Sequence, residues 1–430
     1  MTEEFDTRRE FALSLDETDE LASFRERFNF PQALHGHRPV YLCGHSLGLQ
    51  PKDAVRYVQE ELEDWARLGV EGHFRSRRPW LPYHRFATSG LSELAGARDD
   101  EVVAMNTLTV NLHVLMSTFY RPSTSRYRIL IESTAFPSDR FAAMSQIRMR
   151  GFDPAPALLE WKPRADDQVL HIDDLQQILD DSGDEIALLL LPGVQYYNGQ
   201  LLDMGDVCAR ARAKGCFVGL DLAHAIGNVP LQLHEWGPDF AAWCSYKYLN
   251  GGPGAVGGAF VHARHLGGDG SAQLLGWWGH AEETRFAMAP TFEPARGAEL
   301  WQLSNPPILS LAPVLASLDI FHEAGMDRLR KKSLRLAEYL GRLFEHRLRN
   351  RVVSITPPDA RGSQLSLRVT DAGRGAREVF RSLELQDVFA DWREPNVIRV
   401  ALAPLYNTFA DAFDFVERLQ AAVDAAAGRR

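Results

Sequence analysis

Short apolar runs alternate with longer stretches of helical periodicity through the middle of the chain. The stretch at 203–214 repeats its apolar positions as a helix does, with Asp203 placed to cap its start and Gly215 to end it. Alternation of strands and helices is typical of βαβ units with a mostly parallel sheet. We therefore predict a large α/β domain whose strands include residues 128–131, 186–191, 217–220 and 255–261.

The pattern changes after Asn305-Pro306-Pro307, a segment that interrupts regular structure. Long helical periodicity follows at 308–346, and a last amphipathic helix is expected at 410–426. Between these helices, residues 364–369 and 397–402 read as strands, so a smaller α+β domain is predicted. The expected organisation is an N-terminal segment at 1–65 that joins the small domain, a large domain at 66–307 and the small domain at 308–430.

Composition and charge narrow the function classes. The chain has 430 residues, of which 45% are hydrophobic and 24% charged, as in an ordinary globular protein of two or three domains. The net charge of −10 argues against nucleic-acid binding, which draws on clustered cations. The basic stretch at 75–78 is short and suits at most a small anion. The acidic start at 1–6 lacks the plan of a signal peptide and no run of 18 apolar residues occurs, so a cytoplasmic protein without a membrane partner is expected.

Metal and disulfide chemistry find little support in the sequence. The four cysteines, Cys43, Cys208, Cys216 and Cys244, form no C-x-x-C pair, so buried reduced thiols are expected. His262 and His265 have a loose metal-like spacing, but no third ligand with a recognisable pattern accompanies them. We therefore predict no metal site.

Asp221 and Lys247 form the most informative pair. Asp221 ends an apolar strand, the place where open α/β sheets bind ligands, and Lys247 lies among aromatic residues before the glycine-rich loop at 251–254. Taken singly, Asp221 also suits a helix cap and Lys247 a surface lysine. Together they match pyridoxal 5′-phosphate (PLP), which needs a lysine for its aldehyde and an acid for its pyridine nitrogen. Lys247 is therefore expected to hold PLP as a Schiff base.

A dinucleotide cofactor is the rival interpretation. Gly252, Gly254 and Gly257 fit G-x-G-x-x-G, but that fingerprint should follow a strand and open a helix, whereas here an apolar strand-like run follows it. Two other segments suit an anion and a ring. Thr109 opens a helical stretch whose N–H groups can face an anion, and Phe136 with Ser138 and Asp139 follows the strand at 128–131.

Beyond these residues, the chain resembles the kynureninase family over nearly its whole length. The resemblance implies a PLP enzyme of fold type I that cleaves kynurenine or 3-hydroxykynurenine to an anthranilate and L-alanine. It also implies a homodimer with active sites at the subunit interface. The motifs that carry it are NTLTVNLH at 106–113, FPSD at 136–139, GVQYYNGQ at 193–200, GLDLAHAIGNV at 219–229, WCSYKYLNGGPG at 243–254, GWWGH at 276–280, SNPPIL at 304–309 and IRVALAPLYN at 398–407.

The resemblance also implies roles for individual residues. Lys247 and Asp221 are the expected catalytic residues, and Arg399 is expected to bind the substrate α-carboxylate. His73, Ser304 and Asn305 resemble residues of members that favour 3-hydroxykynurenine, which is the expected preference. Where relatives commonly have a small hydroxyl residue, this chain has Pro192, so one hydrogen bond to the cofactor should be missing. The expected cofactor-binding residues are Leu108, Thr109, Phe136, Pro137, Ser138, Asp139, Asp221, His224, Tyr246 and Lys247, with Trp277 and Asn305 from the partner subunit.

Two alternatives stay open at this point. Another PLP enzyme of the same fold, such as a cysteine desulfurase or an aminotransferase, would share Asp221 and Lys247. A binding protein without catalysis could also use this fold, because a fold does not imply a function. The role of the reaction in tryptophan breakdown or in NAD synthesis is left open as well.

Overall fold

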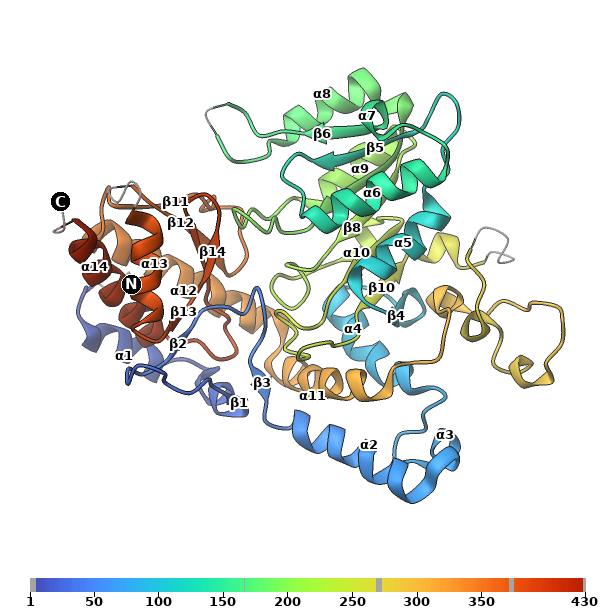
Figure 1. The fold of residues 1–430 in the computed structure, drawn as a ribbon, viewed down its shortest axis with the longest axis horizontal. Coiled ribbons are helices and arrows are strands. Elements are labelled where there is room, and N and C mark those ends of the chain that lie inside the picture. The colour runs from blue at the N-terminus through green and yellow to red at the C-terminus, as the bar shows by residue number, and fades with distance from the viewer. Residues whose placement is uncertain (1–4, 166, 268–272, 371–374, 428–430) are drawn as a thin grey trace.

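A computed structural model describes residues 5–165, 167–267, 273–370 and 375–427 of the chain. Positions 1–4 of the acidic N-terminal stretch lie outside these residues. So do the outer ends of the predicted domains, at residues 1 and 430. Figure 1 shows a large body around one sheet and a smaller body that carries both ends of the chain. Among the described residues, no single helix has the length and apolarity to cross a membrane.

The large body is built on a seven-stranded sheet with the order β4-β10-β9-β8-β7-β5-β6 in the described residues. The strands from β9 to β6 run parallel, whereas β10 is antiparallel to both of its neighbours. The predicted mostly parallel α/β sheet is therefore confirmed. The strands are β4 (Val102–Ala104), β5 (Arg128–Glu132), β6 (Leu158–Trp161), β7 (Ile186–Pro192), β8 (Phe217–Asp221), β9 (Phe240–Trp243) and β10 (Gly258–Val261).

Two details of the sheet differ from the sequence prediction. The run at 255–261 enters the sheet only at Gly258, because the backbone of Gly257 bonds instead to Met105 and Asn106. The short strands β4, β6 and β9 were not predicted. Helices cover both faces, so β7 sends Leu188 and Leu190 into one core and Leu189 and Leu191 into another. Continuous apolar strands are typical of a sheet buried on both sides.

The two helices that the sequence places in the large body, at 203–214 and from Thr109, begin within one residue of the predicted positions. The predicted helix at 203–214 is α9 (Met204–Ala213), and the Asp203 carboxylate caps it by accepting from the Asp206 N–H at 3.0 Å. Pro137 begins α6, as proline does at first helical positions. The other helices are α4 (Thr88–Ala95), α5 (Leu108–Phe119), α6 (Pro137–Met149), α7 (Pro154–Ala157), α8 (Ile172–Ser182) and α10 (Leu233–Trp236).

The periodic stretch at 308–346 forms two helices rather than one. They are α11 (Ile308–Ala324) and α12 (Met326–Arg347), and they meet at 81° where Gly325 adopts a φ of 74°. Glycine reaches this left-handed region without a steric penalty. Leu311 and Phe321 of α11 share a core with the large sheet, whereas Leu336 and Leu340 of α12 belong to the core of the small body. The predicted domain limits remain predictions.

The small body has an antiparallel sheet with the order β11-β12-β15-β14. The N-terminal segment joins it, because β2 pairs with β13 and α1 packs on α14. The predicted strands at 364–369 and 397–402 are β12 and β15. The elements are α1 (Arg9–Glu17), β1 (Phe28–Asn29), β2 (Val40–Tyr41), β3 (Gln50–Pro51), β11 (Val352–Ser354), β12 (Gln364–Val369), α13 (Ala376–Glu384), β13 (Val388–Phe389), β14 (Asp391–Arg393), β15 (Val397–Ala401) and α14 (Phe409–Ala427).

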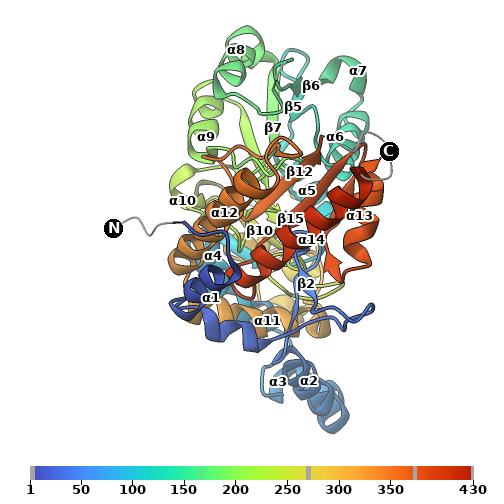
Figure 2. The ribbon, with the colours of Figure 1, turned by 90° about the vertical axis from the view of Figure 1, so that its left-hand side faces the viewer.

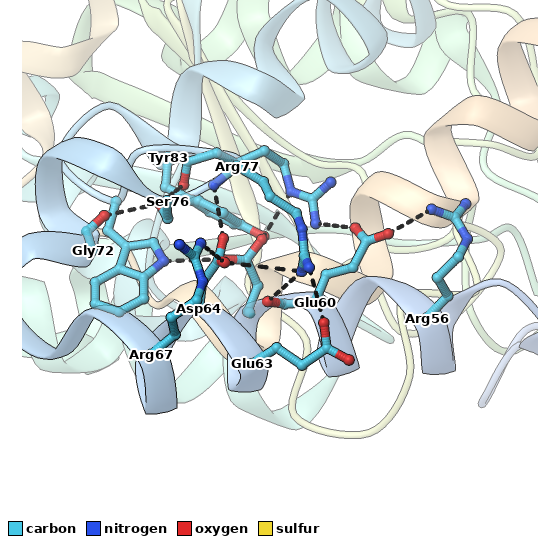
Figure 3. A network of polar contacts seen from close by, with 12 residues as sticks. Arg56, Glu60, Glu63, Asp64, Arg67, Gly72, Ser76, Arg77 and Tyr83 are labelled. Carbon is cyan, nitrogen blue, oxygen red and sulfur yellow. Dashed lines mark hydrogen bonds and ion pairs between the residues drawn. The ribbon is translucent and has the colours of Figure 1, made fainter.

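An arm made of α2 (Ala54–Leu68) and α3 (Gly72–Arg75) projects from the rest of the chain, as Figure 2 shows. The basic stretch at 75–78 follows this arm, and each of its arginines pairs with a carboxylate of the arm: Arg75 with Glu71 at 3.4 Å, Arg77 with Glu63 at 2.9 Å and Arg78 with Glu60 at 2.7 Å. Figure 3 shows the part of this network around Arg77, Glu60 and Glu63. Each arginine of the stretch thus already has a carboxylate partner, and the attraction of a small anion stays a prediction.

Candidate active site

A cavity of about 300 Å³ opens at the carboxyl ends of β5, β7 and β8, on the side that faces the small body. This is where open α/β sheets bind their ligands. Its walls come from both bodies, since two N-terminal residues and two arginines of the small sheet complete it. The lining residues are His45, Ser46, Thr107, Leu108, Thr109, Glu132, Phe136, Ser138, Asp139, Pro192, Val194, Tyr196, Asp221, Ala223, His224, Tyr246, Lys247, Arg393 and Arg399.

The predicted pair Asp221 and Lys247 lies in this cavity. Asp221 is the last residue of β8, is 7% exposed and accepts the N–H of Ala223 at 2.7 Å. Lys247 lies in the turn after β9, and its Nζ is 3.0 Å from His224 Nε2. Burial, together with the charge of Lys247, lowers the pKa of His224 well below 6.5. His224 is therefore a neutral imidazole that accepts a hydrogen bond from the lysine.

A second carboxyl group, that of Asp139, is buried beside Asp221. Burial raises its pKa well above 3.8, and the neighbouring charge of Asp221 raises it further. Its Oδ1 has no hydrogen-bond partner among the described residues. Two adjoining carboxyl groups with one cation nearby suit a protonated ring nitrogen as an additional donor. The two carboxyl groups therefore fit the pyridine end of PLP, whose ring nitrogen would donate to them.

Another part of the cavity suits a phosphate. Thr107 caps α5, and the first turn of this helix, at Leu108 and Thr109, lines the cavity with N–H groups that have no partner within the helix. The Thr109 hydroxyl lies 2.7 Å from that of Ser138. Phe136 is 43% exposed, and its ring stands edge-to-face with Tyr196 at 5.2 Å. An aromatic ring thus lines the same cavity as the first turn of α5 and the carboxyl pair.

Arg399 reaches the cavity from β15. Its side chain is 1% exposed, its Nη1 donates to the backbone oxygen of Tyr196 at 2.6 Å, and its Nη2 pairs with Asp391. Burial lowers the pKa of this guanidinium, but an arginine stays charged under physiological conditions. A buried guanidinium held on two sides is well placed to receive a carboxylate.

Five predicted site residues do not line the cavity of the single chain. Pro137 opens α6 beside the cavity, and His73 lies on the projecting arm with its ring against Trp80 at 5.5 Å. Trp277 is 47% exposed and donates to the backbone of Arg285. Ser304 and Asn305 are exposed before α11. Their expected roles in the site remain predictions.

The lining residues that went unpredicted include His45, Ser46, Glu132, Tyr196 and Arg393. Glu132 ends the apolar strand β5 as Asp221 ends β8, so the same rule would have found it. Tyr196 lies in the quoted motif at 193–200, but nothing in the motif shows which of its side chains faces a ligand. The other three come from distant segments that carry no local signal.

Glu132 is an unusual carboxyl group. It is 1% exposed, and burial raises its pKa to about 7. Its hydrogen bonds are long, from Gln195 Nε2 at 3.3 Å and from the Thr134 hydroxyl at 3.4 Å. Asp221 adds to the rise in pKa as a negative neighbour. Glu132 therefore changes its charge near neutral pH within the cavity.

The fold matches solved structures of PLP-dependent enzymes. The cystine C–S lyase C-DES, in complex with cysteine persulfide, superposes with a TM-score of 0.74 and 18% identity, covering 89% of this chain and 97% of that one. The cysteine desulfurase CsdA from Escherichia coli superposes with a TM-score of 0.73 and 18% identity, covering 95% and 99%. The architecture is thus that of the PLP-dependent enzymes of fold type I.

Sequence relatives then identify the family. A kynureninase from Koribacter versatilis is 50% identical over 97% of this chain and 98% of its own length, and one from Myxococcus xanthus is 51% identical over 97% of each. Residues 329–419 match the kynureninase C-terminal domain. The chain belongs to the kynureninase family.

Proposed function

We propose that this protein is a PLP-dependent hydrolase that cleaves the Cβ–Cγ bond of kynurenines and releases an anthranilate and L-alanine. The observation that carries the proposal is the cavity that joins Lys247, Asp221 and Arg399, in a chain about half identical to kynureninases over nearly its full length. These three side chains supply an amine, an acid and a carboxylate-binding guanidinium.

Each residue has a separate task in this proposal. When bound, PLP supplies an electron sink for the substrate carbon. The Lys247 amine would hold the cofactor aldehyde and, when free, would move a proton at the substrate Cα. Asp221 keeps a proton on the ring nitrogen. His224, which is neutral, accepts the Lys247 N–H and orients the amine toward the substrate.

The remaining contacts hold the two molecules in place. The first turn of α5 binds the phosphate through its free N–H groups, with Thr109, Ser138 and Tyr246 beside it. Phe136 packs against the ring. Arg399 binds the substrate α-carboxylate through charged hydrogen bonds. Pro192 lines the cavity but offers no side-chain donor, so these contacts act without a hydroxyl at that position.

We further propose a cytoplasmic homodimer in which Trp277 and Asn305 complete the site of the partner subunit. Exposed apolar side chains around Trp277 support this proposal, namely Leu274, Leu275, Phe286 and Met288. We also propose a preference for 3-hydroxykynurenine, because a pocket with polar groups such as His73 and Ser304 can engage the ring hydroxyl.

A cysteine desulfurase is a poorer explanation of the site. That chemistry needs a reactive thiol at the substrate. Cys208, Cys216 and Cys244 are buried and Cys43 is half-buried, and burial raises the pKa of all four thiols. Raised pKa values leave these thiols protonated and unreactive.

Product analysis tests the activity. The PLP-loaded protein is incubated separately with L-kynurenine and 3-hydroxy-L-kynurenine, and alanine and the two anthranilates are quantified. We expect both cleavages, with the higher kcat/KM for the hydroxylated substrate. Absence of alanine and anthranilate from both reactions would refute the proposal.

Subunit mixing tests the shared site. Lys247→Ala and Trp277→Ala proteins, each inactive on its own, are unfolded together and refolded. After random reassociation, half of the dimers are mixed. If Trp277 acts in the partner's site, each mixed dimer has one intact site out of two, so about a quarter of wild-type activity returns. If both residues act within one chain, no activity returns.

A further inference from the structure

The register of the small sheet places two arginines and one aspartate on the same face. In the antiparallel pair β14–β15, Asp391 lies directly opposite Arg399 and Arg393 opposite Val397. Side chains two residues apart on a strand point to the same side, so Arg393 shares the face of Asp391. Trp392 points to the other side, where it packs against Phe380. Both arginines of this face line the cavity.

Asp391 is the point at which these groups converge. One of its oxygens, Oδ2, accepts from Ser46 Oγ at 2.7 Å and from Arg393 Nη2 at 3.0 Å, and it pairs with Arg399 as well. His45 Nε2 lies 3.5 Å from the same oxygen. The aspartate thus holds two guanidinium groups and a hydroxyl against the cavity. It does not itself line the cavity.

The charges of this cluster do not balance. Two arginines face one carboxylate, which leaves one positive charge. His45 adds none at neutral pH, because burial lowers its pKa to about 4. The Nε atoms of both arginines are buried and have no hydrogen-bond partner among the described residues. Leaving buried charged donors unpaired is costly, so an anionic ligand is the expected partner.

We propose that Arg393 is a second binding residue for the substrate carboxylate, acting beside Arg399, and that Asp391 positions both guanidinium groups. A single carboxylate neutralises the remaining charge and can accept from the unused Nε–H groups. Arg399 is held by Tyr196 and Asp391, so its orientation is set before the ligand arrives. Arg393 is 37% exposed and its only ion pair among the described residues is with Asp391, so it is the more adaptable of the two. The inference rests on the proposed function only in that the substrate is an amino acid.

Ligands that differ only in the carboxylate test this assignment. The PLP-loaded protein is titrated with L-alanine and, separately, with ethylamine, and binding is followed by the absorbance of the cofactor. Wild type is compared with Arg393→Gln and Arg393→Lys. Arg377→Gln is the matched control. Arg377 carries the same charge, but it lies over the Trp392 ring, 4.9 Å from the ring centre, on the face of the strand away from Arg393.

We expect Arg393→Gln to weaken L-alanine binding by about 10- to 100-fold, the loss of a charged hydrogen bond, and to leave ethylamine binding unchanged. Arg393→Lys should lose less because it keeps the charge without the planar fork. Arg377→Gln should bind both ligands as wild type does.

Three results would overturn the assignment: L-alanine binding by Arg393→Gln within about twofold of wild type, equal losses for both ligands, or a wild type that does not distinguish them. If Arg393→Gln fails to fold, Arg393→Lys decides by the same comparison. Cleavage of L-kynurenine by wild type is measured separately. If wild type does not cleave L-kynurenine but Arg393→Gln selectively loses L-alanine binding, the proposed function is refuted and the assignment of Arg393 stands.

Discussion

Replacement of Glu132 by glutamine should make the protein more stable at neutral and alkaline pH. Glutamine keeps the shape of the side chain but carries no charge at any pH. It can still accept from Gln195 Nε2 and donate to the Thr134 hydroxyl, the two groups that Glu132 contacts. The substitution therefore removes one buried ionisation with little change in packing.

The magnitude follows from the pKa of Glu132. Its ordinary value is 4.5, and burial raises it to about 7 in the folded protein. Folding therefore disfavours the ionised form of Glu132. The free energy of unfolding of the wild type is highest below pH 4.5 and falls as the pH rises through 7. One pKa unit corresponds to about 1.4 kcal/mol, so the loss above pH 7 approaches about 3 kcal/mol. Glu132→Gln should escape this loss.

Urea unfolding of the cofactor-free proteins between pH 5 and pH 8 measures the effect. The difference in unfolding free energy between Glu132→Gln and wild type should grow with pH and level off above pH 7. Glu160→Gln is the control with the opposite sign. Glu160 is in the neighbouring strand β6. Burial is the largest single effect on its pKa and raises it, but the hydrogen bonds and charges of Arg140 and Lys162 together outweigh burial and hold the pKa below 4.5. A difference for Glu132→Gln that stays constant across this range would refute the reasoning.

Three further substitutions have defined outcomes. Lys247→Ala should abolish steady-state cleavage because no other amine in the cavity can hold the cofactor, and product formation over long incubations checks this. Asp221→Asn should weaken PLP binding by about 10- to 100-fold through loss of a charged hydrogen bond, as equilibrium dialysis would measure. Glu61→Leu should destabilise the arm by about 3–5 kcal/mol, because Arg78, Trp80 and Tyr83 all donate to this buried carboxylate at 2.8 to 3.0 Å; an unchanged melting temperature would contradict this.

Local patterns were sufficient to predict that Asp221 and Lys247 share a site. Asp221 and Lys247 each follow an apolar strand, and the carboxyl ends of parallel strands meet at one edge of a sheet. The structure accordingly brings both residues into one cavity. Glu132 obeys the same rule at the end of β5 and was overlooked because a single buried carboxyl group suggests no particular chemistry.

Contacts between distant segments could not be read in the same way. Ser46 and Asp391 are 345 positions apart, and they meet because β2 of the N-terminal segment pairs with β13 of the small body. Arg393 became a candidate only once its register against β15 placed it on the face of Arg399. No periodicity within either segment indicates which strand will lie beside it.

The sequence by itself determined the α/β class, the order of the main elements and, through resemblance, the family, and it predicted that Asp221 and Lys247 share a PLP site. These follow from local patterns and from motifs whose order along the chain is preserved. The tertiary structure alone decided that the helical stretch at 308–346 breaks at Gly325 and that the arginines at 75–78 pair with carboxylates. It also decided that two arginines share Asp391. The physical reason is that burial and charge pairing depend on which distant segments pack together.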